Sequence, residues 1–306
     1  MKFRLGIDLG GTKTEALAIA SDGTELWRRR VPTVPGSYEA TIATIRQLVD
    51  GAESGLGGSA SVGIGIPGTI SPASGLVKNA NSTWLIGRPL DRDLSTALGR
   101  PVRLANDAYC FALSEASDGA AAGLAVVFGV ILGTGVGGGI VVRGRLVGGP
   151  NAIAGEWGHN PLPWPAGDER PGPSCYCGRS GCIETFLSGP ALSRDDGRGL
   201  PAAGIAALDD AQSEASLARY EERLARALAS VINVLDPHAI ILGGGLSNLG
   251  RLYQRVPRLW GKWVFSDSVA TLLLPPKHGD SSGVRGAAWL WPIEPQSGED
   301  MQDHED

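Results

Sequence analysis

The sequence has few cysteines, few methionines, few aromatic residues and no long apolar run. Its 306 residues include 4 cysteines and 2 methionines, and aromatic residues make up 6%. A chain of this length can bury a core without disulfides, so the cysteine count excludes a disulfide-dense secreted scaffold. No stretch approaches the roughly 20 apolar residues of a membrane helix, and the N-terminus lacks a signal-peptide pattern. We therefore expect a cytoplasmic protein that does not enter a membrane.

Charge is also scarce, and its pattern argues against a nucleic-acid partner. Charged residues make up 19% and the net charge is −5. The one basic cluster, Arg28-Arg29-Arg30, ends a strand-like run and is more typical of a solvated strand edge than of a phosphate-binding surface. The length and the 42% of hydrophobic residues fit a globular enzyme of two domains.

Short apolar strand patterns and helical patterns occur in the same order in both halves of the chain. In each half an apolar run leads into a glycine-rich turn and a second β-run. This repetition predicts an internal duplication, with an α/β lobe over residues 1–118 and a second over 119–283. We expect a last helix over about 284–294 to pack back on the first lobe, and an acidic tail over 295–306.

The glycine-rich turns are candidate phosphate-binding sites, because glycine lets backbone N–H groups approach an anion closely. The first turn adds a hydroxyl, an ammonium group and a carboxylate suited to hydrated magnesium. Its candidate residues are Asp8, Gly10, Gly11, Thr12 and Lys13. The second turn contributes Thr134 and Gly135, and a third contributes Gly243, Gly244 and Gly245. Plain glycine hairpins, and a tight helix start for the third turn, are the alternatives.

Two polar segments are candidates for the chemistry and for substrate binding. Asn106-Asp107 ends a strand and opens a helix, where a carboxylate could take a proton from a substrate hydroxyl. The alternative is an ordinary helix N-cap. The loop from Asn79 to Trp84 collects amides, hydroxyls and an indole, groups that bind sugars, although it could be a polar surface loop.

One histidine and three cysteines form a candidate zinc site. They are His159, Cys175, Cys177 and Cys182, enough to close a tetrahedral shell without an open position for water. This predicts a structural zinc ion, the alternative being disulfides or inert thiols. Glu156 and Glu184 flank the cluster. The metal does not need them as ligands, so they are free to form hydrogen bonds with hydroxyl groups of a substrate beside it.

These motifs resemble the ROK family of repressors, open reading frames and kinases. The matching segments are Asp8-Leu-Gly-Gly-Thr-Lys13, Gly155-Glu-Trp-Gly-His159 and Cys175-Tyr-Cys-Gly-Arg-Ser-Gly-Cys-Ile-Glu184. The segments Asn79–Leu85, His159–Trp164 and Lys277–Trp291 are most similar to bacterial fructokinases and mannokinases.

The resemblance implies a two-lobed actin-like ATPase fold (ribonuclease H-like) with an interlobe cleft, a structural zinc ion, Mg-ATP and a hexose. It implies that Asp107 is the catalytic base for the sugar 6-hydroxyl and that the protein is a homodimer. The implied sugar ligands are Asn81, Asn106, Asp107, Glu156, His159 and Glu184. The implied activity is that of a fructokinase with mannose as a second substrate. The alternatives are an N-acetylglucosamine or glucose kinase, or a sugar-sensing repressor, although the first turn at Asp8 leaves no room for a preceding DNA-binding domain.

Overall fold

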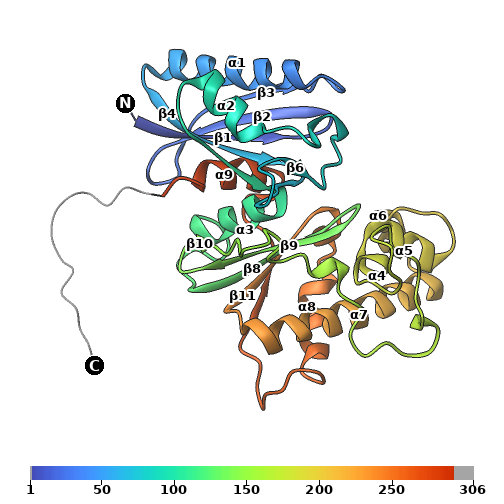
Figure 1. The fold of residues 1–306 in the computed structure, drawn as a ribbon. Coiled ribbons are helices and arrows are strands. Elements are labelled where there is room, and N and C mark those ends of the chain that lie inside the picture. The colour runs from blue at the N-terminus through green and yellow to red at the C-terminus, as the bar shows by residue number, and fades with distance from the viewer. Residues whose placement is uncertain (1, 293–306) are drawn as a thin grey trace, which may run out of the picture.

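The structure is a computed structural model that describes residues 2–292, so the expected acidic tail and the end of the expected last helix lie outside the described residues. Two five-stranded mixed sheets share one strand order (Figure 1). The first consists, in spatial order, of β3 (Glu25–Pro32), β2 (Lys13–Ile19), β1 (Lys2–Leu9), β4 (Ser59–Ile66) and β7 (Val102–Asn106). The second consists of β10 (Arg145–Leu146), β9 (Val136–Val142), β8 (Val126–Leu132), β11 (Ala239–Gly243) and β12 (Leu272–Leu274).

Parallel pairing brings the glycine turns to one edge of each sheet. In the first sheet Asp8 lies opposite Gly65, and Ile66 lies opposite Asn106. In the second sheet Gly243 lies opposite Ile131, at the end of β8. Because the carboxyl ends of parallel strands share an edge, the loops that follow them gather there, as ligand sites do in open α/β sheets.

Helices cover the sheets and build two main hydrophobic cores. They are α1 (Tyr38–Leu56), α2 (Leu90–Leu98), α3 (Asp107–Ser117), α4 (Glu184–Leu187), α5 (Gly189–Asp196), α6 (Ala202–Ala207), α7 (Ala211–Leu235), α8 (Arg251–Trp260) and α9 (Ser282–Trp289). In α1, Ser37 accepts a hydrogen bond from the N–H of Ala40 at the start, and Ile45, Leu48 and Val49 form the buried stripe. A small hairpin of β5 (Thr69–Ile70) and β6 (Val77–Lys78) projects from the first sheet.

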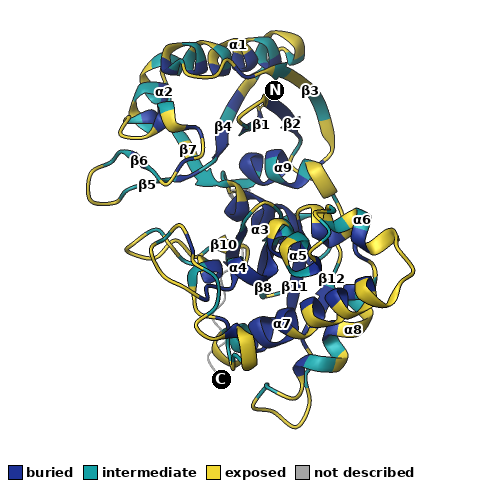
Figure 2. Cartoon of the chain, turned by 90° about the vertical axis from the view of Figure 1, so that its right-hand side faces the viewer, coloured by how far each residue is buried: buried dark blue, intermediate teal, exposed yellow. Residues whose placement is uncertain are grey.

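Helices α3 and α9 cross between the two sheets (Figure 1). Helix α3 packs on β8 and β9, whereas α9 packs on β1, β2 and β4. Their contact is at backbone distance, because a Cβ on Gly286 would lie 1.7 Å from the carbonyl oxygen of Cys110. A Cβ on Gly63 of β4 would lie 1.8 Å from the carbonyl oxygen of Ala287. Only glycine permits such approaches. Figure 2 shows both helices dark blue, as buried as the strands beside them.

A buried carboxylate ties the two crossing helices together. Glu115 of α3 is fully buried and accepts hydrogen bonds from the hydroxyl of Ser282 (2.7 Å) and the N–H groups of Lys277 (2.9 Å) and His278 (3.2 Å). These donors come from the start of α9 and the segment before it. A buried charge is tolerated when it is saturated with donors in this way.

The Arg28–Arg30 cluster lies on β3, the edge strand, as expected of a solvated edge. Arg28 and Arg30 both pair with the buried carboxylate of Glu15, at 2.6 Å each. Within residues 2–292, no helix is both long and apolar enough to cross a membrane.

Candidate active site and metal centre

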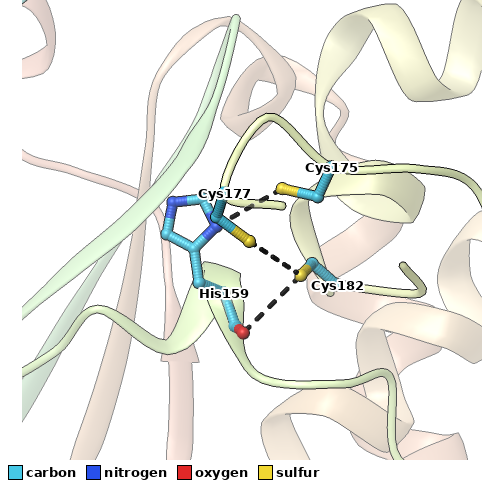
Figure 3. A group of neighbouring side chains, drawn as sticks. All are labelled: His159, Cys175, Cys177 and Cys182. Carbon is cyan, nitrogen blue, oxygen red and sulfur yellow. Dashed lines mark hydrogen bonds between the residues drawn. The ribbon is translucent and has the colours of Figure 1, made fainter. Parts of the chain in front are cut away.

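The predicted zinc ligands lie together around a common centre (Figure 3). Their ligand atoms all lie within 4.8 Å of one another, with Cys177 Sγ 3.6 Å from Cys182 Sγ and Cys175 Sγ 3.5 Å from His159 Nδ1. Tetrahedral zinc with ordinary Zn–S and Zn–N bonds requires ligand–ligand edges of about 3.5–3.8 Å. All four cysteines are free. The donor set therefore fits a closed zinc site.

Backbone pairing brings the ligands together. His159 ends the short helix η2 (Trp157–His159), and the residues after it pair with the segment around Cys182. The N–H of Ile183 donates to Asn160 O, and the N–H of Leu162 donates to Gly181 O, both at 2.9 Å. The metal would therefore cross-link two segments, residues 160–162 and 181–183, that already pair through backbone hydrogen bonds.

An ion cluster anchors this loop to α7. Glu169 bonds Arg223 and Arg226, with nitrogen–oxygen distances of 2.7–2.9 Å. Burial alone would raise the pKa of Glu169, but the hydrogen bonds from Arg226 and Arg223 outweigh it and hold the pKa at about 2. Removing one partner would leave a buried charge without compensation, so the loop is held firmly.

The zinc loop also touches the second glycine turn. Glu184 opens α4, and its Oε2 accepts a hydrogen bond of 2.9 Å from the N–H of Val136. The N–H of Gly189 donates to Gly133 O at 2.8 Å. His159 directs Nδ1 toward the thiols, and its Nε2 lies 2.9 Å from the hydroxyl of the exposed Tyr176. With Nδ1 on a metal, Nε2 stays available for another hydroxyl group.

Asp107 lies at the junction of the two sheets, at the start of α3. Its Oδ1 accepts a 2.8 Å hydrogen bond from the N–H of Ala108. The residue is exposed. Desolvation raises the pKa of its carboxyl, against the lowering effect of hydrogen bonds from Ala108 and Asn106. A carboxyl group with a raised pKa suits a role as proton acceptor.

Asp8, at the end of β1, is the second perturbed carboxyl group. Burial raises its pKa to about 6, and the negative charges of Asp107 and Glu15 act in the same direction. Lys13 in the adjoining turn acts against them. Two carboxylates this close favour a cation between or beside them.

Glu156 shares this electrostatic environment. Desolvation raises its pKa, with His159 opposing and the charges of Asp107 and Glu184 adding to the rise. The structure therefore brings Asp8, Asp107, Glu156, His159 and Glu184 into one site.

The three glycine turns follow the carboxyl ends of β1, β8 and β11. In the first, the N–H of Gly10 donates to Lys13 O at 3.0 Å, and Gly11, Thr12 and Lys13 are exposed. Thr134 of the second turn is exposed as well. In the third, a Cβ on Gly244 would lie 2.4 Å from Leu132 O, so the second and third turns are neighbours.

Asn106 is the N-cap residue of α3, as the helix-cap alternative predicted. Its Oδ1 accepts a 2.8 Å hydrogen bond from the N–H of Ala108, and its Nδ2 donates to Gly68 O at 3.3 Å. Gly68 also lies against Ala80, the residue before the exposed Asn81. The expectation that the indole of Trp84 faces the sugar is wrong. Its N–H donates to the hydroxyl of Thr41 on α1, and the ring packs on the core of the first sheet.

Two residues of this region have no recognisable sequence motif. Lys78 of β6 lies beside the second lobe, with Nζ 3.4 Å from Asn151 O, and its charge lowers the pKa of Glu156. Tyr109 of α3 is buried next to the same glutamate. Neither has a spacing signal, because their contacts join segments distant in sequence.

Duplicated α/β sheets with glycine turns at their edges and a desolvated carboxylate between them define a two-lobed phosphotransferase fold. The chain belongs to the ROK family, whose profile matches residues 4–294. The predicted family is confirmed.

Relatives and solved structures agree with this assignment. N-acetyl-D-glucosamine kinase of Yersinia enterocolitica is 40% identical over 296 residues, covering 93% of this chain and 98% of that protein. The Pasteurella multocida enzyme of the same name is 41% identical over 302 residues, covering 94% and 99%. The crystal structure of a ROK hexokinase from Thermus thermophilus superposes with a TM-score of 0.84 at 30% identity, covering 94% of this chain and 97% of that one. The actin-like fold expectation is thereby confirmed.

The expectation of a fructokinase with mannose as a second substrate is wrong. The full-length relatives at about 40% identity are N-acetyl-D-glucosamine kinases.

Proposed function

We propose that this protein is an ATP-dependent N-acetyl-D-glucosamine kinase that phosphorylates the sugar 6-hydroxyl. The observation that carries the proposal is identity of about 40% to N-acetyl-D-glucosamine kinases over 93% of the chain. The desolvated Asp107 at the junction of the sheets supports it.

Asp107 is the proposed general base. Oδ1 is occupied by the N–H of Ala108, which leaves Oδ2 to orient the sugar hydroxyl and accept its proton. The hydroxyl oxygen then forms a bond to the γ-phosphorus while the bond to the leaving β-phosphate oxygen breaks. The raised pKa of Asp107 makes the carboxylate a better proton acceptor.

The glycine turns are the proposed nucleotide site. Backbone N–H groups of Gly10–Lys13 and of Thr134-Gly135 would bind phosphate oxygens, with the Lys13 ammonium adding charge, and Gly243–Gly245 would line the nucleoside end. A bound magnesium ion would neutralise charge on the phosphates, and Asp8 would hold the hydrated ion.

The sugar is proposed to lie between the zinc loop and the first sheet. Glu156, His159 Nε2 and Glu184 would accept or donate hydrogen bonds on one side, and the amides of Asn81 and Asn106 on the other. The predicted zinc ion would hold His159 and the loop in place without touching the reacting atoms. Lobe boundaries at 1–118 and 119–283, a homodimer and a cytoplasmic location stay predictions.

The test is ADP release with Mg-ATP across N-acetylglucosamine, glucose, N-acetylmannosamine, fructose and mannose. The highest kcat/KM on N-acetylglucosamine, with loss of turnover on its 6-deoxy analogue, supports the proposal. The highest kcat/KM on glucose would overturn the choice of sugar but keep the mechanism. No turnover on any sugar, from protein that holds zinc, would overturn the kinase activity.

A further inference from the structure

Tyr109 carries a buried hydroxyl group that has no hydrogen-bond partner among the described residues of the free protein. It lies on α3 two residues after Asp107, and its side chain is only 8% exposed. The phenol oxygen is shielded from solvent and makes no hydrogen bond of ordinary geometry with any described residue. A buried polar group without a partner lowers stability, so its presence beside the candidate site requires an explanation.

Close packing fixes this phenol beside the segment that carries Glu156. A Cβ on Gly139 of β9 would lie 3.1 Å from the Cα of Tyr109. A Cβ on Gly155 would lie 2.5 Å from Gly138 O. Helix α3, strand β9 and the residues around Gly155 are therefore stacked at backbone distance, and α3 has little freedom to move the phenol elsewhere.

The missing partner is an acceptor for the hydroxyl proton. Burial and the negative charge of Glu156 raise the pKa of Tyr109, and the nearby backbone of Ala154 lowers it. Even an N–H of Ala154 aimed at the phenol oxygen would leave the hydroxyl proton without an acceptor. Glu156 is exposed, and among the described residues its carboxylate makes no hydrogen bond. Within the described chain, the phenol is thus a donor without an acceptor, and Glu156, whose charge acts on it, is an acceptor without a donor.

We propose that Tyr109 is a positioning residue for Glu156. When the sugar binds, Glu156 turns inward and accepts a hydrogen bond from the Tyr109 hydroxyl, while its other oxygen accepts one from a sugar hydroxyl. The phenol does not contact the sugar itself, because its oxygen is shielded from solvent in the free enzyme. This inference rests on the proposed role of Glu156 as a sugar ligand.

The first test is Tyr109→Phe, which removes only the hydroxyl. Because the hydroxyl has no partner in the free enzyme, Tm is expected to rise by roughly 1–3 °C. Sugar binding loses a charge-assisted hydrogen bond, so KM for the sugar is expected to rise on the order of 10- to 100-fold, with KM for ATP unchanged. A merely structural hydroxyl would give a lower Tm and unchanged sugar binding, and that result overturns the proposal.

Tyr38→Phe is the matched control. Tyr38 is also buried, but its hydroxyl donates to Asp93 at 2.7 Å on the outer side of the first lobe. This variant should have a lower Tm and an unchanged KM for the sugar.

A double-mutant cycle tests whether Tyr109 acts through Glu156. Sugar affinity is measured by calorimetry for Glu156→Ala, Tyr109→Phe and the combination, using the sugar that the wild type turns over best. In the Glu156→Ala background, Tyr109→Phe should have no further effect. Additive losses would overturn the proposal. A wild type that prefers another sugar refutes the proposed substrate, yet leaves both the cycle and the Tm measurement readable.

Discussion

Replacing Asp8 by asparagine should stabilise the fold while abolishing the activity that the carboxylate serves. Asp8 is half-buried, and its side chain makes no hydrogen bond with a described residue. Replacing it by asparagine therefore breaks no hydrogen bond. Its nearest neighbours include Gly65 and Gly283, whose Cβ positions would lie 3.5–3.7 Å from the carboxylate oxygens. The substitution therefore removes a charge with almost no change in shape.

The magnitude follows from the pKa of Asp8, which burial first and then Asp107 and Glu15 raise from 3.8 to about 6. The native state therefore holds this proton more tightly than the unfolded state. The charged form is penalised in full above pH ~6, and the penalty disappears below pH ~4, where both states are protonated. The upper bound is about 3 kcal/mol, and partial solvent exposure reduces the expected gain to about 1–2 kcal/mol.

The assay is urea unfolding of the zinc-loaded, magnesium-free wild type and Asp8→Asn at a series of pH values. The variant should be more stable at pH 7–8, and the two curves should converge as pH falls from 6 to 4. A variant that is less stable at pH 7, or a gain independent of pH, would refute the reasoning. Asp22→Asn is the control, because Asp22 is exposed and accepts a hydrogen bond from Thr24 N–H, so no gain is expected at any pH.

Three further predictions concern the site. Asp107→Asn should keep the fold and the zinc content but lose about 10²–10⁴-fold in kcat, measured by ADP release, and near-normal turnover would contradict its role as base. Cys177→Ser should lower both bound zinc, measured by elemental analysis, and Tm; stoichiometric zinc in the variant would show that the ligand set is wrong. The raised pKa values of Asp107 and Asp8 should place the acid limb of kcat/KM well above pH 4, with activity lost as pH falls, and a limb at or below pH 4 would exclude both groups as its origin.

Local patterns predicted most of the secondary structure and the cysteines that gather in the candidate zinc site. Apolar runs around Phe3, Val62 and Ala239 are strands, and the spacing of Ile45, Leu48 and Val49 marks a helix. Periodicity is a local property, and so is the short spacing of Cys175, Cys177 and Cys182. These features can therefore be predicted without knowledge of the fold.

Contacts between distant segments could not be predicted in the same way. The bond from Val136 N–H to Glu184, the approach of Lys78 to Asn151 and the burial of the Tyr109 hydroxyl depend on how the sheets are joined. The inward turn of Trp84 toward Thr41 is of the same kind. The fructokinase expectation is corrected by the relatives of about 40% identity, which are N-acetyl-D-glucosamine kinases.

The crossing of α3 and α9 amounts to an exchange within a single chain. Helix α3 follows the strands of the first sheet yet covers the second, whereas α9 follows the second sheet and covers the first. During synthesis from the N-terminus, the face of β1, β2 and β4 that α9 covers therefore stays uncovered until residues 282–289 are made, almost the last of the described chain. Each half forms one core of its own, within residues 3–94 and 128–273, whereas two smaller clusters contain residues of α3 and α9. The first sheet can therefore reach its final packing against α9 only after residues 282–289 have been made.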